Sequence, residues 1–297
     1  MRNFYITTDS NSDLPNEYLK KFNTTIIPQY YSFDGVIYGD KKNLSPKEFY
    51  ARMTDGELPG SLANNPDVVE KKFRAILDKG CDIIHISFSS ALSGSYGVVS
   101  SVAKDLLKEY PEAKISVIDS LNVCLNESIM LIHAENLKAR NFTYEEIVAD
   151  LESFKKHLNV QFTVDDLYHL QRGGRVSKTT AVVGSALNLK PFLQLSKEGT
   201  LVSCGTIRGR EKSLRTLVLR MKDTLDDTVD YTLPVGIAHA SCLKEAEFLA
   251  DLIKKETPFT TVMINDLSPS IGVHTGSGAI GVLYYGKEKP AAAEFAM

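Results

Sequence analysis

The sequence predicts an α/β protein of two domains, the first with a doubly wound, mostly parallel sheet and the second with a mixed sheet. Through the first half, short β-branched runs alternate with amphipathic helical runs, which is typical of a parallel sheet covered by helices. Beyond residue 158 a hairpin signal at Lys197-Glu198-Gly199 favours antiparallel pairing. The chain of 297 residues is long enough for two separate cores. We therefore predict domains at 1–158 and 159–297.

Turn and cap residues delimit the elements of the first half. Ser45 with Glu48, and Thr143 with Glu146, form capping-box patterns at the starts of two helices. Asp34-Gly35 is a hairpin signal. The strands expected here are 4–8, 25–33, 36–38, 81–87 and 114–119. The helices expected here are 15–22, one from 45, 67–79, one from about 96, 129–139 and 143–157.

The same signals predict the second half. Strands are expected at 159–164, 192–195, 201–204, 234–240, 260–264 and 282–285. Helices are expected at 179–187, 209–225 and 243–256. Residues 287–297 are expected to form a loosely held helix or a frayed end.

Composition restricts the classes of function. The formal net charge of −3 indicates no nucleic-acid-binding surface, and no apolar run approaches the ~20 residues of a membrane span. The amino-terminal residues lack the apolar stretch of a signal peptide. The four cysteines are far apart, so reduced thiols are expected rather than disulfides or metal ligands. We expect a cytoplasmic protein with at most transient membrane contact.

Several well-known motifs fail when their context is considered. Residues 276–281 spell GxGxxG, but a dinucleotide site needs a helix next, and 282–285 is predicted as a strand. Residues 173–179 are similar to a phosphate-binding loop, yet the residue directly before Lys178 is Ser177 and not the glycine that this motif needs. No GxSxG elbow and no zinc-ligand spacing of histidines is present. We therefore expect no metal, no cofactor and no complete catalytic site.

Small polar residues at turns are the remaining candidates. Ser93 and Gly94 lie in SFSSALSGSYG (87–97), between a predicted buried strand and a helix, where free N–H groups and the helix dipole favour an anion. Capping of that helix is the alternative, and it is the commoner role of serine there. Ser61, ahead of a helix that begins with proline, has the same two interpretations. His274 lies in a glycine-flanked loop with few apolar neighbours, so functional and structural roles both stay open.

Basic residues of the second half form a further group of candidates. They are Arg172, Arg175, Lys178, Arg208 and Arg210. Contacts with phosphate or with a partner are one interpretation, and a solvated surface is the default for scattered basic side chains.

Six short sequence blocks are spread along essentially the whole chain. They are TDSNSDLP (8–15), SSALSGSY (89–96), VIDS (117–120), LQRGGRVSK (170–178), TIRGREKSL (206–214) and HTGSGAIGV (274–282). In this order they resemble the DegV family of bacterial fatty-acid-binding proteins, which includes the acyl-carrier subunit of fatty acid kinase. The resemblance implies a two-domain DegV-like fold with one long-chain fatty acid between the domains. It also implies a separate kinase subunit that phosphorylates the acyl carboxylate for phospholipid synthesis, while the carrier alone performs no chemistry.

The resemblance also implies roles for individual residues. Ser61 and Ser93 match the hydroxyls that bind the carboxylate, and His274 matches the histidine that reaches it directly or through water. Arg175 and Arg208 match arginines that face the kinase and its nucleotide phosphates.

Three positions depart from the family pattern. Ser95 replaces a usual threonine but keeps the hydroxyl. Ser277 replaces a frequent proline, which we expect to loosen the loop that carries His274. Leu125-Asn126-Glu127 replaces a glycine-containing segment, which leaves the pocket wall and the chain-length preference open.

Physical chemistry supports a neutral site for an acid head group. Burial is worth ~0.8 kcal/mol per methylene, so the acyl tail dominates the affinity. A buried carboxylate costs several kcal/mol unless it is hydrogen-bonded. Ser61, Ser93, the Gly94 N–H and the helix dipole meet that cost. We expect no Lys or Arg beside Ser93, because a countercharge makes the carboxylate less nucleophilic.

Other classes of function stay open. A serine/histidine-dependent hydrolase, or a small-molecule transferase of related fold, needs a base beside Ser93 and an acid to orient that base. His274 is the candidate base, and no acid is evident. A kinase needs its own nucleotide and Mg²⁺ site. A scaffold without a ligand predicts a collapsed cleft, and Ser93→Ala distinguishes it from a carrier.

Overall fold

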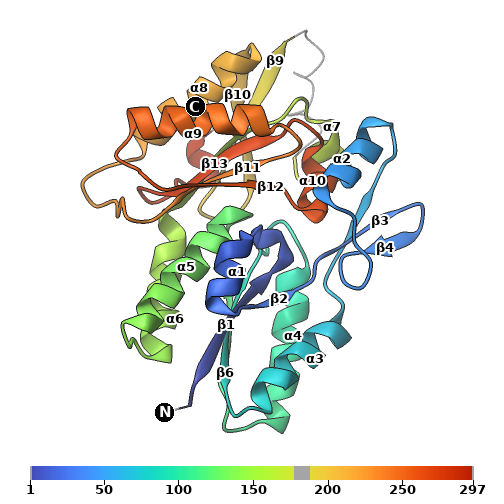
Figure 1. Ribbon diagram of the computed structural model, residues 1–297, viewed down its shortest axis with the longest axis vertical. Coiled ribbons are helices and arrows are strands. Elements are labelled where there is room, and N and C mark those ends of the chain that lie inside the picture. The colour runs from blue at the N-terminus through green and yellow to red at the C-terminus, as the bar shows by residue number, and fades with distance from the viewer. Residues whose placement is uncertain (1, 177–187, 296–297) are drawn as a thin grey trace.

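Three sheets organise the part of the chain that the structure describes (Figure 1). The computed structural model describes residues 2–176 and 188–295, so the helix predicted at 179–187 lies outside the described residues. The four-stranded sheet occupies the lower half of Figure 1 and the six-stranded sheet the upper half, while strands of the three-stranded sheet project at the right. The α/β fold class predicted from the sequence is confirmed.

The four-stranded sheet is parallel and has helices on both faces. Its strands are, in order, β2 (Thr25–Ile27), β1 (Phe4–Asp9), β6 (Asp82–Ser87) and β7 (Ile115–Asp119). Successive side chains of β6 alternate, so Ile84 and Ile86 join the core of one helix pair and Ile83 that of the other. The first pair is α5 (Leu125–Ala139) and α6 (Tyr144–Phe154), and the second is α3 (Pro66–Leu77) and α4 (Ser95–Glu109). This is the predicted doubly wound arrangement.

The six-stranded sheet is mixed, as predicted. Its strands are, in order, β10 (Leu201–Arg208), β9 (Leu189–Leu195), β8 (Leu158–Thr163), β13 (Ile280–Tyr285), β11 (Val235–His239) and β12 (Val262–Asp266). β11 and β12 pair in parallel, and the other neighbours are antiparallel. α8 (Arg210–Asp223) and α9 (Leu243–Glu256) share an apolar core with one face. The opposite face presents Phe162, Leu193 and Ala238 to a separate core.

The three-stranded sheet is antiparallel and completes that second core. Its strands are, in order, β4 (Val36–Tyr38), β3 (Tyr30–Phe33) and β5 (Gly60–Leu62). Its buried aromatic residues belong to the same core as side chains of α2 (Pro46–Thr54) and α10 (Pro269–Thr275). The Tyr50 hydroxyl of α2 donates a hydrogen bond to the Leu267 carbonyl at 3.0 Å. The short helix α7 (Tyr168–Arg172) packs against α10.

The run 25–33, predicted as one strand, is two strands in different sheets. Pro28 lies between them, and proline has no N–H with which to continue a ladder of hydrogen bonds. β2 therefore pairs with β1, whereas β3 pairs with β4 across the predicted Asp34-Gly35 turn.

Helix starts agree with prediction where cap residues mark them. Both predicted capping boxes form, at the starts of α2 and α6. α5 instead begins at Leu125, ahead of the predicted start at 129. Residues 126–128 are polar and interrupt the apolar pattern, although all three are fully buried. The pattern of apolar residues could not reveal this first turn, because its polar residues are buried and a sequence shows residue type rather than burial.

α5 is the element that joins the two larger sheets. It contacts β1 and β6 of the four-stranded sheet, and β8, β11 and β13 of the six-stranded sheet.

β8 begins at Leu158, next to the predicted domain boundary, and the division into domains stays a prediction. Three short 3-10 turns, η1 (Ser10–Ser12), η2 (Lys155–His157) and η4 (Ala292–Phe295), complete the described elements. Within residues 2–176 and 188–295, no helix is long and apolar enough to cross a membrane.

Candidate functional site

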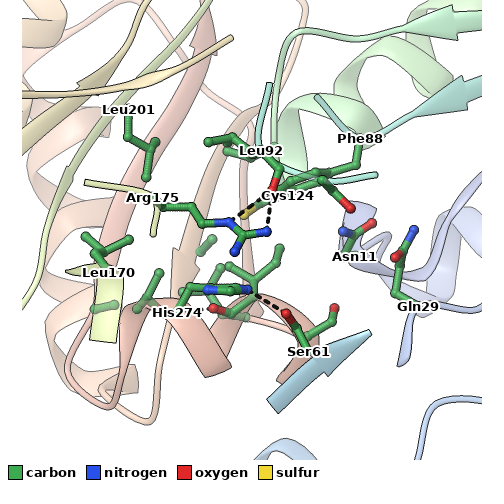
Figure 2. Close-up of a pocket in the computed structure, with 18 of the residues that line it drawn as sticks. Asn11, Gln29, Ser61, Phe88, Leu92, Cys124, Leu170, Arg175, Leu201 and His274 are labelled. Carbon is green, nitrogen blue, oxygen red and sulfur yellow. Dashed lines mark hydrogen bonds between the residues drawn. The ribbon is translucent and has the colours of Figure 1, made fainter. Parts of the chain in front are cut away.

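A largely apolar cavity of about 290 Å³ lies against the open face of the six-stranded sheet. This volume is near the lower end of the ~300–1,000 Å³ range of small-molecule pockets. Residues of the three-stranded and six-stranded sheets line it, together with residues of the loop after β6, of the segment just before α5, and of α7 and α10. Its polar lining residues are Asn11, Gln29, Ser61, Ser93, Gly94, Arg175, Ser270, His274 and Thr275. Figure 2 shows Ser61, Arg175 and His274 pointing toward one another within this lining.

Ser61 and His274 come from elements that the sequence did not predict. Ser61 lies on β5 opposite Tyr31, and His274 lies in the last turn of α10 rather than in a loop. α10 has only seven residues, too few for a helical period to show in the sequence. The Ser61 Oγ and the His274 Nε2 are 2.9 Å apart (Figure 2). Two residues more than 200 positions apart therefore form one hydrogen-bonded pair.

The imidazole of His274 is neutral at neutral pH. Burial, and then the nearby Arg175 and Arg172 charges, lower the pKa of His274 to about 4. Its Nδ1 is buried and has no hydrogen-bond partner within the described residues. The ring lies against Gly173, where a Cβ would come within 2.1 Å of Nδ1. A neutral imidazole offers one N–H donor and one lone pair, so this ring suits a hydrogen bond to an anion.

Ser93 and Gly94 lie in the loop between β6 and α4 and line the cavity. The Ser93 Oγ accepts a hydrogen bond from the Ser95 N–H at 3.2 Å and donates one to the Ser95 Oγ at 3.0 Å. Ser95 Oγ in turn donates to the Gln29 Oε1 at 2.9 Å. Ser93 therefore both supports the first turn of α4 and faces the cavity, so the two interpretations are compatible. Its hydroxyl has to rotate before it can donate to a ligand.

Arg175 contradicts the expectation that the head-group site contains no charged side chain. Its guanidinium is half-buried and lines the cavity together with Ser93. Nε and Nη2 donate to the Leu92 carbonyl at 3.0 and 2.7 Å, and Nη1 donates to the Gly173 carbonyl. Burial lowers the pKa of Arg175 from its usual value. The expectation of no Arg beside Ser93 is therefore wrong, because the turn at residues 173–175 brings the side chain back onto Leu92.

Arg208 is not brought to the cavity. It lies exposed at the end of β10, opposite Leu189 of β9, and does not line the cavity. Of the residues proposed from the sequence, Ser61, Ser93, Gly94, Arg175 and His274 all line the cavity, and Arg208 does not.

The glycine-rich loop after His274 packs tightly on the segment that contains α7. A Cβ on Gly276 would meet the His169 ring at 2.6 Å, and one on Gly278 would meet the Asp165 carboxylate at 2.2 Å. Both glycines have positive φ angles, of 74° and 79°. Ser277 between them has a buried hydroxyl with no hydrogen-bond partner in the described chain. Whether serine in place of proline loosens this loop stays a prediction.

Sequence reasoning missed Gln29 and Asn11 as lining residues. Asn11 lies in the block TDSNSDLP (8–15), to which no role in the site was assigned, and no motif marks Gln29. Arg172, a candidate from the sequence, donates to the Pro59 carbonyl at 2.7 Å and so ties α7 to the segment leading into β5.

The fold and the cavity together define a class of protein. The chain is an α/β protein whose apolar cavity includes one group of hydrogen-bonded polar side chains, an arrangement that suits a ligand with an apolar body and a polar end.

Comparison with known proteins identifies the family. A family model described as an uncharacterised protein of the DegV family matches residues 3–287. The chain belongs to the DegV family. A DegV domain-containing protein of Clostridium perfringens is 33% identical over 291 residues, covering 97% of this chain and 99% of that protein. One of Streptococcus pyogenes serotype M1 is 31% identical over 288 residues, covering 96% and 98%.

Solved structures of similar fold are described as fatty-acid-binding proteins. A DegV family protein from Thermus thermophilus has a TM-score of 0.84 and 25% identity, covering 96% of this chain and all of that one. DegV of Bacillus subtilis has a TM-score of 0.82 and 26% identity, covering 97% and 100%. A stearic acid-binding protein from Eubacterium ventriosum has a TM-score of 0.83 and 25% identity, covering 95% and 98%.

Proposed function

We propose that this protein binds one long-chain fatty acid, with the acyl tail in the apolar cavity and the carboxylate at Ser61, Ser93, the Gly94 N–H and His274. The observation that carries the proposal is the Ser61–His274 pair, which lies with Ser93 in the wall of an otherwise largely apolar cavity. The similar structures from Thermus thermophilus, Bacillus subtilis and Eubacterium ventriosum, each described as binding fatty acid, support it.

The tail and the head group contribute in different ways. Each buried methylene contributes ~0.8 kcal/mol, so the tail supplies most of the affinity. The carboxylate needs hydrogen bonds to offset its desolvation, and the cavity offers two hydroxyls, a neutral imidazole and a backbone N–H. The Arg175 guanidinium, already bonded to backbone carbonyls, adds a partly compensating positive charge.

We further propose that the protein presents the bound acid to a separate fatty acid kinase subunit, which forms the acyl phosphate, and that it has no complete catalytic site of its own. A second hollow shares Leu92, Ser93, Gly94, Arg175 and Leu201 with the cavity. A carboxylate at Ser93 would lie at the wall between the two spaces, where a phosphoryl donor can approach from outside. Arg175 is at this wall, and Arg208 is the second proposed contact with the kinase.

The hydrolase alternative rests on the Ser61–His274 pair, which has the geometry of a nucleophile and a base. Two observations disfavour it. A triad needs an acid at Nδ1, and this nitrogen lies against Gly173 with no partner among the residues described. The pKa of about 4 also makes His274 a weak base.

The first test is mass spectrometry of an organic extract of the purified protein, with native mass spectrometry for stoichiometry. One long-chain fatty acid per chain is the expected result. A clean extract, together with no uptake of added palmitate or oleate, would overturn the proposal.

A second experiment tests the kinase role. Addition of a fatty acid kinase catalytic subunit and ATP to the loaded protein should yield acyl phosphate. If loaded protein gives no acyl phosphate, binding stands and the kinase role does not.

A further inference from the structure

The strand register gives the cavity a direction. Ala279, just before β13, and Gly281 and Leu283 on it line the cavity from one face of the sheet, since alternate side chains point the same way. His274 is in the last turn of α10, four residues of chain separate it from Ala279, and both line the cavity. We therefore place the polar group at the Ala279 end of this path, with Leu283 about 13 Å further along at ~3.3 Å per residue. A ligand with its carboxylate at His274 therefore extends its tail along β13 toward Leu283.

Small residues form the floor of this path. Gly281 lies opposite Ala238 of β11, and both line the cavity. One step further along, Gly236 of β11 lies opposite Leu283. The sheet thus offers a groove of small residues that continues from Ala238 to Gly236.

Leu125 fills the groove at Gly236. It is the first residue of α5 and is fully buried. A Cβ added to Gly236 would come within 2.7 Å of the Leu125 Cβ and 3.0 Å of its Cδ1, so the leucine occupies the space that the glycine leaves. Val123 and Cys124, just before it, line the cavity, whereas Leu125 and Gly236 do not. The cavity therefore stops where Leu125 rests on the sheet.

We infer that Leu125 is a specificity-determining residue that sets the maximum length of the acyl chain, an inference that rests on the proposed fatty-acid binding. The leucine and Gly236 form a stop at the tail end of the groove. A smaller side chain at 125 extends the cavity over Gly236, and a larger one at 236 pushes the leucine toward the ligand. This gives a role to the segment Leu125-Asn126-Glu127, which departs from the family pattern.

The test compares affinities for saturated fatty acids of 12, 14, 16, 18 and 20 carbons by native mass spectrometry and competition. Affinity for the wild type should rise by up to about fourfold per methylene until the tail reaches Leu125, and then stop rising. Leu125→Ala should move this plateau by about two methylenes, raising affinity for the longer acids relative to 14 carbons by up to about fifteenfold. Gly236→Ala should move it toward shorter acids.

Leu131→Ala is the matched control, because Leu131 is equally buried on α5 but belongs to the core of the four-stranded sheet. It should leave the order of affinities unchanged. If folded Leu125→Ala and Gly236→Ala both keep the wild-type plateau, the inference is wrong while fatty-acid binding stands. If the wild type binds none of the five acids, the proposed function itself fails. If Leu125→Ala does not fold, Gly236→Ala still tests the inference, because it should shorten the longest acid that fits where Leu125→Ala should lengthen it.

Discussion

At the scale of single residues, the proposed head-group site consists mostly of neutral polar groups. His274 has two nitrogens in different situations, with Nε2 bonded to Ser61 and Nδ1 against Gly173. Because its pKa is lowered to about 4, the ring is a neutral hydrogen-bonding group over the physiological range. In the proposed function, the carboxylate is therefore held by oriented hydrogen bonds, with Arg175 as the source of positive charge.

Ser61→Ala or Ser93→Ala should weaken palmitate binding by about 10- to 100-fold, since a hydrogen bond to a charged group is worth ~1.5–3 kcal/mol. Binding of hexadecanol, which has the same chain but no carboxylate, should change much less. Isothermal titration or competitive displacement measures both affinities. Ser101→Ala on the exposed side of α4 is the control. Equal losses for the acid and the alcohol would show that the serines shape the cavity instead of binding a carboxylate.

Gly173→Ala should displace the His274 imidazole from Ser61, because the new Cβ would come within 2.1 Å of Nδ1. We expect palmitate affinity to fall at least tenfold while the protein stays folded. Gly97→Ala within α4 is the control, since a Cβ there meets no atom within 4 Å. The measurement is palmitate affinity alongside thermal unfolding. Unchanged affinity in a folded Gly173→Ala variant would contradict the role given to this contact.

At the scale of elements, the first turn of α5 is unusually polar for a buried helix. Asn126 Nδ2 donates to the Asn122 Oδ1 at 3.0 Å, and Ser128 Oγ donates to the Ser12 carbonyl at 2.8 Å. Glu127 has neither oxygen bonded among the residues described. Burial, followed by the charges of Asp9, Asp13 and Asp119, raises the pKa of Glu127 well above its ordinary value. The turn thus combines a structural anchor with a carboxyl that resists ionisation.

This carboxyl should make stability depend on pH. A carboxyl whose pKa is higher in the folded state binds more protons there, so the free energy of unfolding falls as pH rises above the unfolded value of ~4.3 and until the folded pKa is passed. Glu127→Gln should therefore raise the free energy of unfolding more at pH 8 than at pH 5.

Thermal and denaturant unfolding between pH 5 and 8 measure this difference. Asp13, whose pKa is also raised by burial, contributes in the same direction, and its coupling to Glu127 is part of the measured difference. Glu112→Gln, at an exposed glutamate, is the control. A stability difference that does not change with pH would show that Glu127 titrates normally.

At the scale of the whole molecule, the cavity exists only because distant parts of the chain meet. Ser61 belongs to the three-stranded sheet, Ser93 to a loop of the four-stranded sheet, and His274 to a helix beside the six-stranded sheet. Asp13 helps to join two of these parts. Its side-chain Oδ1 accepts a hydrogen bond at 3.1 Å from the N–H of Ser268, the residue just before α10. This hydrogen bond links the segment after β1 to the start of α10.

Palmitate should therefore stabilise the protein as one unit. At a free concentration of 100 times Kd, a ligand that binds only the folded state adds about 2.7 kcal/mol. Because the cavity is lined by two of the sheets and by the loop that follows β6 of the third, we expect a single calorimetric transition that moves upward by several degrees. A thermogram with two transitions, of which palmitate moves only one, would mean that one side of the site suffices for binding.

The sequence alone determined the elements that local rules control. The capping boxes of α2 and α6, the alternation of strand and helix, and the hairpin at Asp34-Gly35 all depend on neighbouring residues, so they were predictable. β5, α7 and α10 were not predicted, because each is too short to show a period and is held by tertiary contacts.

The candidate site also has parts that the sequence predicts and parts that it does not. Ser61, Ser93 and His274 were found from the types of residue at turns and from the resemblance to a family. Only the tertiary structure decided that Ser61 bonds to His274, that Arg175 folds back onto Leu92, and that Arg208 lies away from the cavity. The packing of Leu125 against Gly236 is another contact that only the tertiary structure shows. These are contacts between residues distant in the chain, and they depend on how sheets and helices pack, which no local pattern encodes.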